Sequence, residues 1–254
     1  IDLNCDMGES FGMYRMGLDE EVIRYVSSVN IACGFHAGDP MWMRRTVQLA
    51  EKHNVAIGAH PSFPDLVGFG RRNVAVTPEE AKADLVYQVG ALRAFTQTNT
   101  LQHVKPHGAL YNRAVADDQI ARAVCEAVLE VDPNTILLAL AGSSWVKIAE
   151  DMGLRVAREI FADRALNPDG TLVSRSVPGA VLHDVDEVVR RSLWMVTEGC
   201  ATAVDGREIE VQADSLCIHG DTPGAVEMAA TLRRELDAAG VAVEPLGCPV
   251  KSHL

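Results

Sequence analysis

Ile1-Asp-Leu-Asn-Cys-Asp6 combines the apolar positions of a buried strand with a polar side chain at every second position. Because successive side chains of a strand point to opposite faces, Asp2, Asn4 and Asp6 share one face. Polar groups on a buried strand are costly unless they are paired or used. Asp2 lies deepest and is expected to be structural, whereas Asn4 and Asp6 are expected to face a functional site.

Polar side chains also gather near the ends of four further strand-like runs. These runs are Asn30-Ile-Ala-Cys-Gly-Phe-His36, Gly58-Ala-His60, His103-Val-Lys-Pro-His107 and Cys217-Ile-His219-Gly-Asp221. Since the carboxyl ends of parallel strands meet at one edge, these groups are expected to surround one pocket. The arrangement is typical of the active site of an α/β enzyme.

Strand-like and helical runs alternate along the whole chain, which predicts one parallel β/α domain spanning residues 1–254. Seven strands are expected, at residues 1–6, 29–35, 55–59, 103–105, 136–140, 156–161 and 215–219. Polar strand ends occur around the whole series, and this favours a closed barrel over an open sheet with one switch point. The expected fold class is α/β, a single irregular (β/α) barrel of about seven parallel strands.

Helix-start signals separate these strands. Asp39 before Pro40 is typical of an N-cap followed by proline in the first turn, and predicts a helix to about His53. Thr77-Pro-Glu-Glu80 has the pattern of a capping box. Apolar stripes and a Thr-Pro start predict three more helices, near residues 120–131, 185–199 and 222–240.

Two connections are longer than a turn between a strand and a helix requires. They span residues 61–76 and 163–183, and connections of this length in compact domains tend to be lids or binding loops. A third segment, residues 201–212, is expected to form a hairpin that turns at Asp205-Gly206.

The chain has 254 residues and a formal net charge of −12 at pH 7, which argues against nucleic acid and anionic membranes as partners. Its six cysteines form no closely spaced pair, so buried free thiols in a reducing cytoplasm are expected. We expect no membrane span and no signal peptide. Phosphate-binding P-loop, dinucleotide-binding and serine-nucleophile motifs are missing from the sequence.

Imidazoles, carboxylates and an ammonium group are candidates for acid/base and electrostatic catalysis. The candidate catalytic residues are Asp6, His36, His60, Lys105, His107 and Glu159. Asp6, His36 and His60 would suit either a zinc-type metal site or a metal-free acid/base cluster. Lys105 is expected to hold a substrate carboxylate or a developing oxyanion, with a structural ion pair as the alternative. Its truncation to alanine is expected to remove activity without unfolding the protein.

A second set of residues is expected to bind substrate or phosphate. These residues are Asn4, Asp39, Arg71, Arg72, Asp163, Arg164, His219 and Asp221. Arg71 and Arg72 follow a flexible glycine-rich segment and suit a carboxylate or phosphate, with a solvated turn as the alternative. His219 and Asp221 precede the expected last helix, whose N-terminus would favour an anion.

Seven segments, in order along the chain, resemble motifs of the LamB/YcsF family. They are DLNCDMGES at 2–10, NIACGFHAGD at 30–39, GAHPSFPD at 58–65, GFGRR at 68–72, VKPHGALY at 104–111, EIFADR at 159–164 and CIHGD at 217–221. The resemblance covers essentially the whole chain. It implies an irregular (β/α) barrel like that of the glycoside hydrolase/deacetylase group.

The resemblance also implies the activity of that family, the A subunit of bacterial 5-oxoprolinase. That enzyme cleaves 5-oxo-L-proline to L-glutamate with hydrolysis of ATP, so ATP with Mg²⁺ and two further subunits, B and C, are implied as cofactor and partners. Two other functions stay open. One is a metal-dependent deacetylase of an N-acyl sugar, suggested by fold analogy alone, and the other is a non-catalytic substrate-binding subunit.

Overall fold

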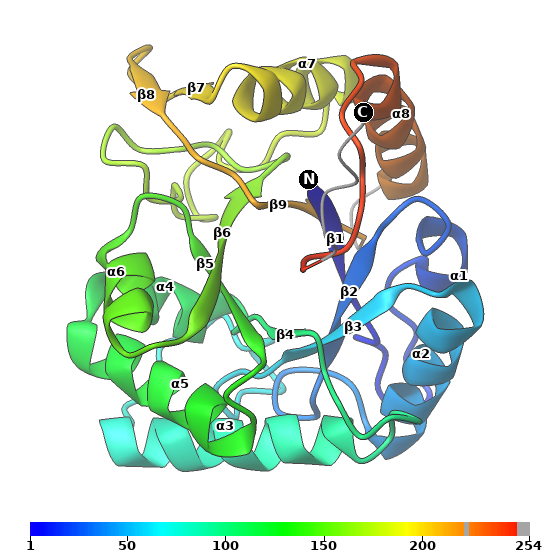
Figure 1. The fold of residues 1–254 in the computed structure, drawn as a ribbon, viewed down its shortest axis with the longest axis vertical. Coiled ribbons are helices and arrows are strands. Elements are labelled where there is room, and N and C mark those ends of the chain that lie inside the picture. The colour runs from blue at the N-terminus through cyan, green and yellow to red at the C-terminus, as the bar shows by residue number, and fades with distance from the viewer. Residues whose placement is uncertain (221–223, 248–254) are drawn as a thin grey trace.

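Seven parallel strands close into a barrel in the computed structural model, which describes residues 1–220 and 224–247 (Figure 1). β1 (Asp2–Met7) pairs with both β2 (Ser28–Ala32) and β9 (Ser215–His219), and so closes the sheet. The others follow in chain order as β3 (Ala56–His60), β4 (His103–Val104), β5 (Ile136–Leu140) and β6 (Arg155–Phe161). The predicted barrel of about seven parallel strands is confirmed.

β4 is shorter than predicted because Pro106, just beyond it, has no N–H to donate. Hydrogen bonding to β3 and its continuation nevertheless persists on both sides of this proline. Lys105 N–H donates to the Ala59 carbonyl at 2.9 Å, and His107 N–H donates to the Pro61 carbonyl at 2.8 Å. The backbone therefore holds both side chains at the carboxyl end of the barrel.

Helices surround the barrel in Figure 1, and the predicted cap signals begin two of them. The Asp39 side chain accepts hydrogen bonds from two backbone N–H groups at the start of α2 (Pro40–His53). Thr77 and Glu80 form the predicted capping box at the start of α3 (Pro78–Arg93). The other helices are α1 (Asp19–Val22), α4 (Gly108–Ala116), α5 (Asp118–Val131), α6 (Ser144–Asp151), α7 (Val185–Thr197) and α8 (Ala225–Ala238).

The helices predicted from apolar stripes correspond to α5, α7 and α8, whereas the short helices α1, α4 and α6 were not predicted. α8 is described from Ala225, and the expected Thr222-Pro223 start lies outside the described residues. β7 (Cys200–Thr202) and β8 (Glu208–Glu210) pair antiparallel outside the barrel, which confirms the predicted hairpin. No element of regular secondary structure interrupts residues 61–76 or 163–183.

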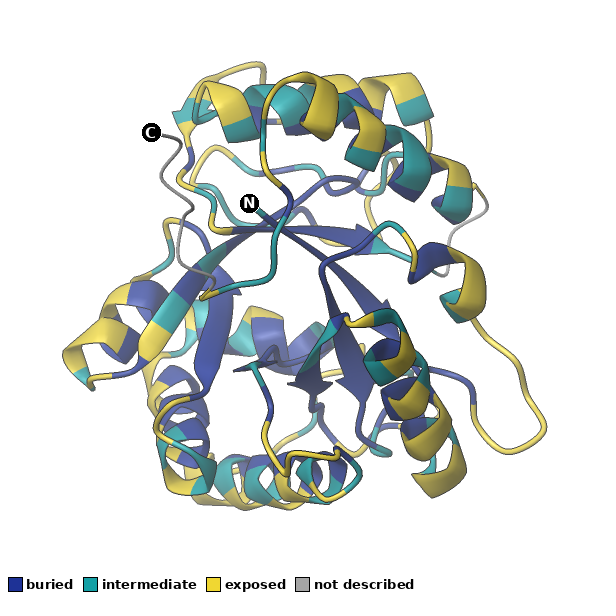
Figure 2. Ribbon diagram, turned by 45° about the vertical axis from the view of Figure 1, so that its right-hand side comes forward, coloured by how far each residue is buried: buried dark blue, intermediate teal, exposed yellow. Residues whose placement is uncertain are grey.

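The barrel strands are buried along almost their full length, while the helices expose one face to solvent (Figure 2). Polar side chains nevertheless point into the barrel. At its amino end Asp2 accepts hydrogen bonds from the hydroxyls of Ser27, Ser28 and Ser215. Burial raises the pKa of the Asp2 carboxyl above its ordinary value despite these donors. Asp2 thus has the structural role that was predicted for it.

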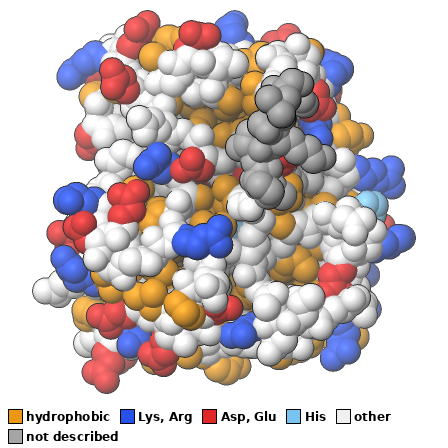
Figure 3. Space-filling view, viewed as in Figure 1, with side chains coloured by type: hydrophobic (Ala, Val, Ile, Leu, Met, Phe, Trp, Pro, Cys, Tyr) orange, Lys and Arg blue, Asp and Glu red, His pale blue; other side chains and the backbone are white. Residues whose placement is uncertain are grey.

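Charged side chains of both signs are interspersed on the face drawn in Figure 3. Within the described ranges, the helices fall short of the length and apolar character that a bilayer crossing requires. Five cysteines in these ranges are free thiols, and four of them are buried. The expectation of free thiols is confirmed for these five, and Cys248 lies outside the described residues.

Gly58 is predicted to be essential for packing inside the barrel. It pairs with His103 in the β3–β4 register, and a Cβ at residue 58 would overlap the His103 imidazole. That ring is buried and contacts the Asn30 side-chain oxygen at 2.7 Å, so it has little room to move. Gly58→Ala is expected to lower the free energy of unfolding by about 1–3 kcal/mol, measured by urea denaturation.

Gly90→Ala is the matched control, because a Cβ at this exposed position of α3 meets nothing within 4 Å. It is expected to leave stability unchanged or to raise it by up to about 1 kcal/mol. Equal stability of the two variants would contradict the packing argument.

Candidate functional site

A cavity of about 590 Å³ opens at the carboxyl end of the barrel strands. It is lined by seven of the predicted site residues, namely Asp6, His60, Arg71, Lys105, His107, Arg164 and His219. His36 lies directly behind this wall, with its ring stacked on that of His107 at a centroid distance of 3.9 Å. Strand ends far apart in the sequence therefore converge at one mouth, as their period-two pattern indicated.

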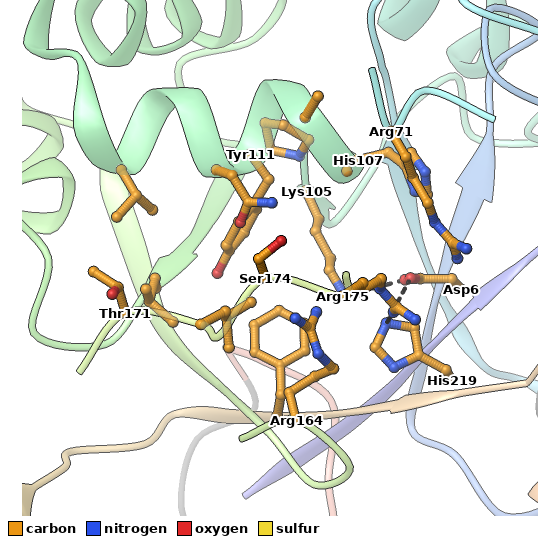
Figure 4. Close-up of a pocket in the computed structure, with 18 of the residues that line it drawn as sticks. Asp6, Arg71, Lys105, His107, Tyr111, Arg164, Thr171, Ser174, Arg175 and His219 are labelled. Carbon is orange, nitrogen blue, oxygen red and sulfur yellow. Dashed lines mark hydrogen bonds and ion pairs between the residues drawn. The ribbon is translucent and has the colours of Figure 1, made fainter. Parts of the chain in front are cut away.

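Lys105 lies at the centre of a buried polar network. Its Nζ is 2.8 Å from Glu159 Oε1, and it donates to Cys217 Sγ at 2.9 Å. It also lies 3.1 Å from Asp6 Oδ1, and both residues are labelled in Figure 4. Burial disfavours the ammonium, yet the two carboxylates hold the pKa of Lys105 well above its usual range. The ion pair that was the alternative for Lys105 is therefore present, and Lys105 also lines the cavity, so its role in activity stays a prediction.

Asp6 connects this network to two histidines. Its Oδ2 lies 3.3 Å from His60 Nε2 and 3.9 Å from His219 Nε2. Burial raises the pKa of the Asp6 carboxyl, but the charges of His60 and Lys105 outweigh it and leave that pKa well below its ordinary value. Asp6 is consequently ionised at neutral pH and contributes a fixed negative charge to the cavity wall.

Three buried imidazoles, those of His36, His60 and His107, gather beside Glu9. His107 Nδ1 lies 3.0 Å from His60 Nε2, and His36 Nε2 lies 3.5 Å from Glu9 Oε1. Burial is the largest cause that lowers the pKa of His36 and of His107 well below the ordinary value, and neighbouring imidazoles lower it further. Both rings are therefore neutral at pH 7.

The glycine-rich turn at residues 68–72 packs directly onto these histidines. The Phe69 ring meets the His36 and His107 rings edge to face, with centroids 5.5 and 5.2 Å away, and its carbonyl lies 2.9 Å from His107 Nε2. Gly70 has a φ of +63°, and a Cβ there would overlap the Ser62 hydroxyl and press on the Cβ of His36 and the ring of His107. Only glycine allows the turn to approach this closely.

His219 and Asp163 form a dyad on the opposite side of the mouth. His219 Nδ1 lies 2.9 Å from both carboxylate oxygens of Asp163, while its Nε2 lies 3.0 Å from Arg175 Nη2. Burial raises the pKa of Asp163, but the charge and hydrogen bond of His219 outweigh it, so the pKa is below its usual value. An ionised Asp163 orients the imidazole, and His219 Nε2 on the cavity side accepts a hydrogen bond from the Arg175 guanidinium.

Three arginines line the cavity, but they play different parts. Arg164 donates to the carbonyls of Val173 and Ala180, and so holds the connection between β6 and α7 in place. Burial lowers the pKa of Arg164 to about 10. Arg71 and Arg175 are both labelled in Figure 4. Arg71 lies over the Phe69 ring, 4.8 Å from its centroid, and Arg175 is exposed. Arg71 and Arg175 thus bring two guanidinium groups to the mouth, and Arg175 donates to His219.

Other predicted site residues lie outside the cavity wall. Asn4 accepts a hydrogen bond from Lys105 and donates one to Glu159 at 3.2 Å. Asn4 and Glu159 therefore support the buried network around Lys105 and do not line the cavity. Asp39 caps α2 and accepts a hydrogen bond from Gly12 N–H. Arg72 is ion-paired with Asp65. Asp221 lies outside the described residues.

The candidate residues named from the sequence did not include Glu9, Tyr111 or Arg175, which also line the cavity. Glu9 lies two residues beyond β1, where strand periodicity no longer reports on side-chain direction. Tyr111 is in α4, four residues after His107, and this spacing is the sequence feature that could have indicated that Tyr111 lines the cavity. Arg175 belongs to a long irregular connection, and no local pattern indicates which of its residues turns inward.

Comparison with known proteins shows similarity over nearly the full length. The model of the LamB/YcsF family matches residues 1–250. The A subunit of 5-oxoprolinase from Pyrococcus furiosus is 55% identical over 253 residues, covering 99% of each chain. Its counterpart from Alkaliphilus metalliredigens is 56% identical over 238 residues, covering 93% of each chain.

Two solved structures are similar to this chain, one in sequence and fold and the other in fold alone. A lactam utilization protein from Thermus thermophilus superposes with a TM-score of 0.90 at 50% identity, covering 96% of this chain and 98% of its own. A putative cellobiose-phosphate cleavage protein from Enterococcus faecalis has a TM-score of 0.53 at 11% identity, with 95% of each chain covered, and shares the fold alone.

Lys105 is predicted to be required for stability. Lys105→Met removes the cation and leaves Asp6 and Glu159 buried without it, so the free energy of unfolding should fall by about 3–5 kcal/mol in denaturant titrations. Lys82→Ala is the control, because Lys82 pairs with two exposed glutamates and its loss should cost less than about 1 kcal/mol. A Lys105→Met variant as stable as the control would show that the network does not depend on this ammonium.

Proposed function

Because the chain belongs to the LamB/YcsF family, we propose that it is the A subunit of an ATP-dependent 5-oxoprolinase, which opens 5-oxo-L-proline to L-glutamate. The observation that carries the proposal is the cavity at the barrel mouth. It combines a histidine–carboxylate dyad with guanidinium groups, which are the two kinds of group that lactam hydrolysis needs. Full-length similarity to proteins named as the A subunit of 5-oxoprolinase supports the same assignment.

The chemistry explains why ATP is needed. A five-membered lactam is a poor electrophile, and its hydrolysis is unfavourable. Attack of the lactam oxygen on the γ-phosphorus of ATP, with ADP leaving, activates the ring carbon. Water then adds to this carbon, the carbon–nitrogen bond breaks as nitrogen takes a proton, and hydrolysis of the resulting γ-glutamyl phosphate releases phosphate. Such a site requires cations for the substrate carboxylate and phosphate, and a base for water.

Individual residues fit these requirements. Arg71 and Arg175 lie at the mouth, where they would hold the substrate carboxylate or the transferred phosphoryl group. Asp163 fixes the tautomer and orientation of His219, which would take a proton from water once Arg175, now bonded to its Nε2, turns to the bound anion. Lys105 and Asp6 would supply the fixed charges behind the reacting atoms.

Partner subunits are proposed to complete the site. The sequence has no P-loop for ATP with Mg²⁺, although the γ-phosphate and the lactam must meet in a water-poor site. Apolar side chains stand exposed on the connections after β1 and β3, with Met13 93%, Tyr14 81% and Val67 91% exposed. Exposed apolar clusters mark protein contacts, so subunits B and C are proposed to dock here and over residues 163–183. A shared cytoplasmic location is proposed, where ATP is available.

Reconstitution tests the proposal directly. Glutamate release from 5-oxoproline with ATP and Mg²⁺ is measured for the chain alone and then with both partner subunits. We expect turnover only in the complete mixture. Full turnover by the lone chain would contradict the partner requirement, and an inactive complete mixture would remove the 5-oxoprolinase assignment. If the complete complex binds substrate and no cavity variant changes its kcat, the chain would be a non-catalytic subunit.

Asp163→Asn is predicted to lower kcat of the reconstituted enzyme by about 10²–10⁴-fold, because His219 loses the carboxylate that orients and stabilises it as a base. Stability is measured in parallel by thermal unfolding. Asp169→Asn is the control in the same connection, since Asp169 is exposed and bonds only to Thr171 among the interactions described. Equal kcat for the two variants would exclude His219 as the base.

A further inference from the structure

His36 has an unexplained environment. Its side chain is 0% exposed, and neither ring nitrogen has a hydrogen-bond partner within the described part of the chain. Leaving buried polar atoms unsatisfied costs about 1–3 kcal/mol for each group. Such an atom in a folded protein points to an ion, a water molecule or a functional role.

His60 and His107 present a second unexplained feature. His60 Nδ1 lies 2.6 Å from the Lys105 carbonyl, and His107 Nε2 lies 2.9 Å from the Phe69 carbonyl, so both nitrogens must carry hydrogens. The remaining nitrogens, His60 Nε2 and His107 Nδ1, lie 3.0 Å apart. His60 Nε2 also lies 3.3 Å from the Asp6 carboxylate, and the contact with His107 requires either a proton on one of the two nitrogens or a metal ion between them.

We propose that Glu9, His36, His60 and His107 form a binding site for a divalent transition-metal ion of the zinc class. One oxygen or nitrogen from each residue can be chosen so that all four atoms lie within 4.8 Å of one another. Tetrahedral zinc, with bonds of about 2.0–2.2 Å, places its ligand atoms about 3.3–3.6 Å apart. The observed separations, 3.0 Å for His60–His107, 3.5 Å for His36–Glu9 and 4.0 Å for His107–Glu9, scatter around this value.

The hydrogen bonds of His60 and His107 support this assignment. In metal sites the second nitrogen of a ligating imidazole usually donates to a carbonyl or carboxylate, which fixes the tautomer. The Lys105 and Phe69 carbonyls are such acceptors. His36 and His107 stack in parallel, so binding of one ion by both requires one ring to turn. His36 is the ring that can do so without breaking a hydrogen bond.

A second group of potential ligands, Asp6, Cys217 and His219, does not carry the same inference. Lys105 Nζ lies 3.1 Å from Asp6 and 2.9 Å from Cys217, so an ammonium already supplies the positive charge there. The sequence had suggested Asp6 with His36 and His60 as ligands. The geometry instead places Asp6 with Lys105, and brings Glu9 and His107 to the other two histidines.

The proposed site borders the cavity through Glu9, His60 and His107. A bound divalent ion there would polarise a carbonyl or phosphoryl oxygen of a substrate, or lower the pKa of a water molecule. This inference goes beyond the proposed function, because it is tested on the isolated chain without ATP, 5-oxoproline or partner subunits.

The experiment measures Zn²⁺ and Co²⁺ binding to the chain after treatment with a chelator. Isothermal titration is expected to give one Zn²⁺ per chain, and Co²⁺ is expected to give the visible absorption bands of a four-coordinate nitrogen/oxygen site. Removing a residue that only hydrogen-bonds to a metal ligand weakens metal binding roughly 10–100-fold. His107→Ala and Glu9→Gln each remove a proposed ligand and are expected to weaken Zn²⁺ binding by more than this. Circular dichroism checks that each variant is folded.

His183→Ala is the matched control, because His183 is exposed in the connection before α7 and is not among the proposed ligands. It should bind Zn²⁺ as the unmodified chain does. Absence of stoichiometric binding and of Co²⁺ bands in the unmodified chain would overturn the proposal, and a shared proton would then explain the contact between His60 and His107. Equal binding by Glu9→Gln, His107→Ala and the control would also overturn it, by showing adventitious surface binding.

Discussion

The ion pairs of Lys105 with Asp6 and Glu159 are the constraint on which the rest of the site depends. Two carboxylates inside a barrel repel each other and are costly to desolvate, so an ammonium between them is what makes this interior possible. The pairing also fixes the position of Asp6, and Asp6 in turn contacts His60 and His219 on the two sides of the mouth. A structural interaction thereby sets the electrostatics of the cavity.

The barrel interior differs from the branched apolar filling that is common in such folds. Asn4 accepts hydrogen bonds from Asn30 and Lys105 and donates to Glu159, so amides carry the connection across the lumen. Each partner comes from a different strand or, for Lys105, from the residue just after β4, which makes strand register a condition for satisfying these buried groups. Gly58 contributes to the same packing, because the absence of a side chain leaves space for the His103 imidazole.

Much of the fold could be predicted from the sequence, because strand alternation and helix caps are local signals. The convergence of Asp6, His60 and His219 followed from that alternation together with the parallel barrel. The structural part played by Lys105 could not be established, since it depends on distances to carboxylates 99 and 54 residues away in the chain. Arg175 could not be identified either, because side-chain direction in an irregular connection depends on tertiary contacts.

The connection at residues 61–76 contacts the histidine cluster on its inner side and solvent on its outer side. Its inner side is tightly constrained, since Phe69 has a φ of +55° and its carbonyl contacts His107. Its outer side exposes Val67 almost completely. Only one residue, Gly68, separates Val67 from Phe69. A protein that packed on Val67 would therefore lie beside the turn whose backbone contacts His107.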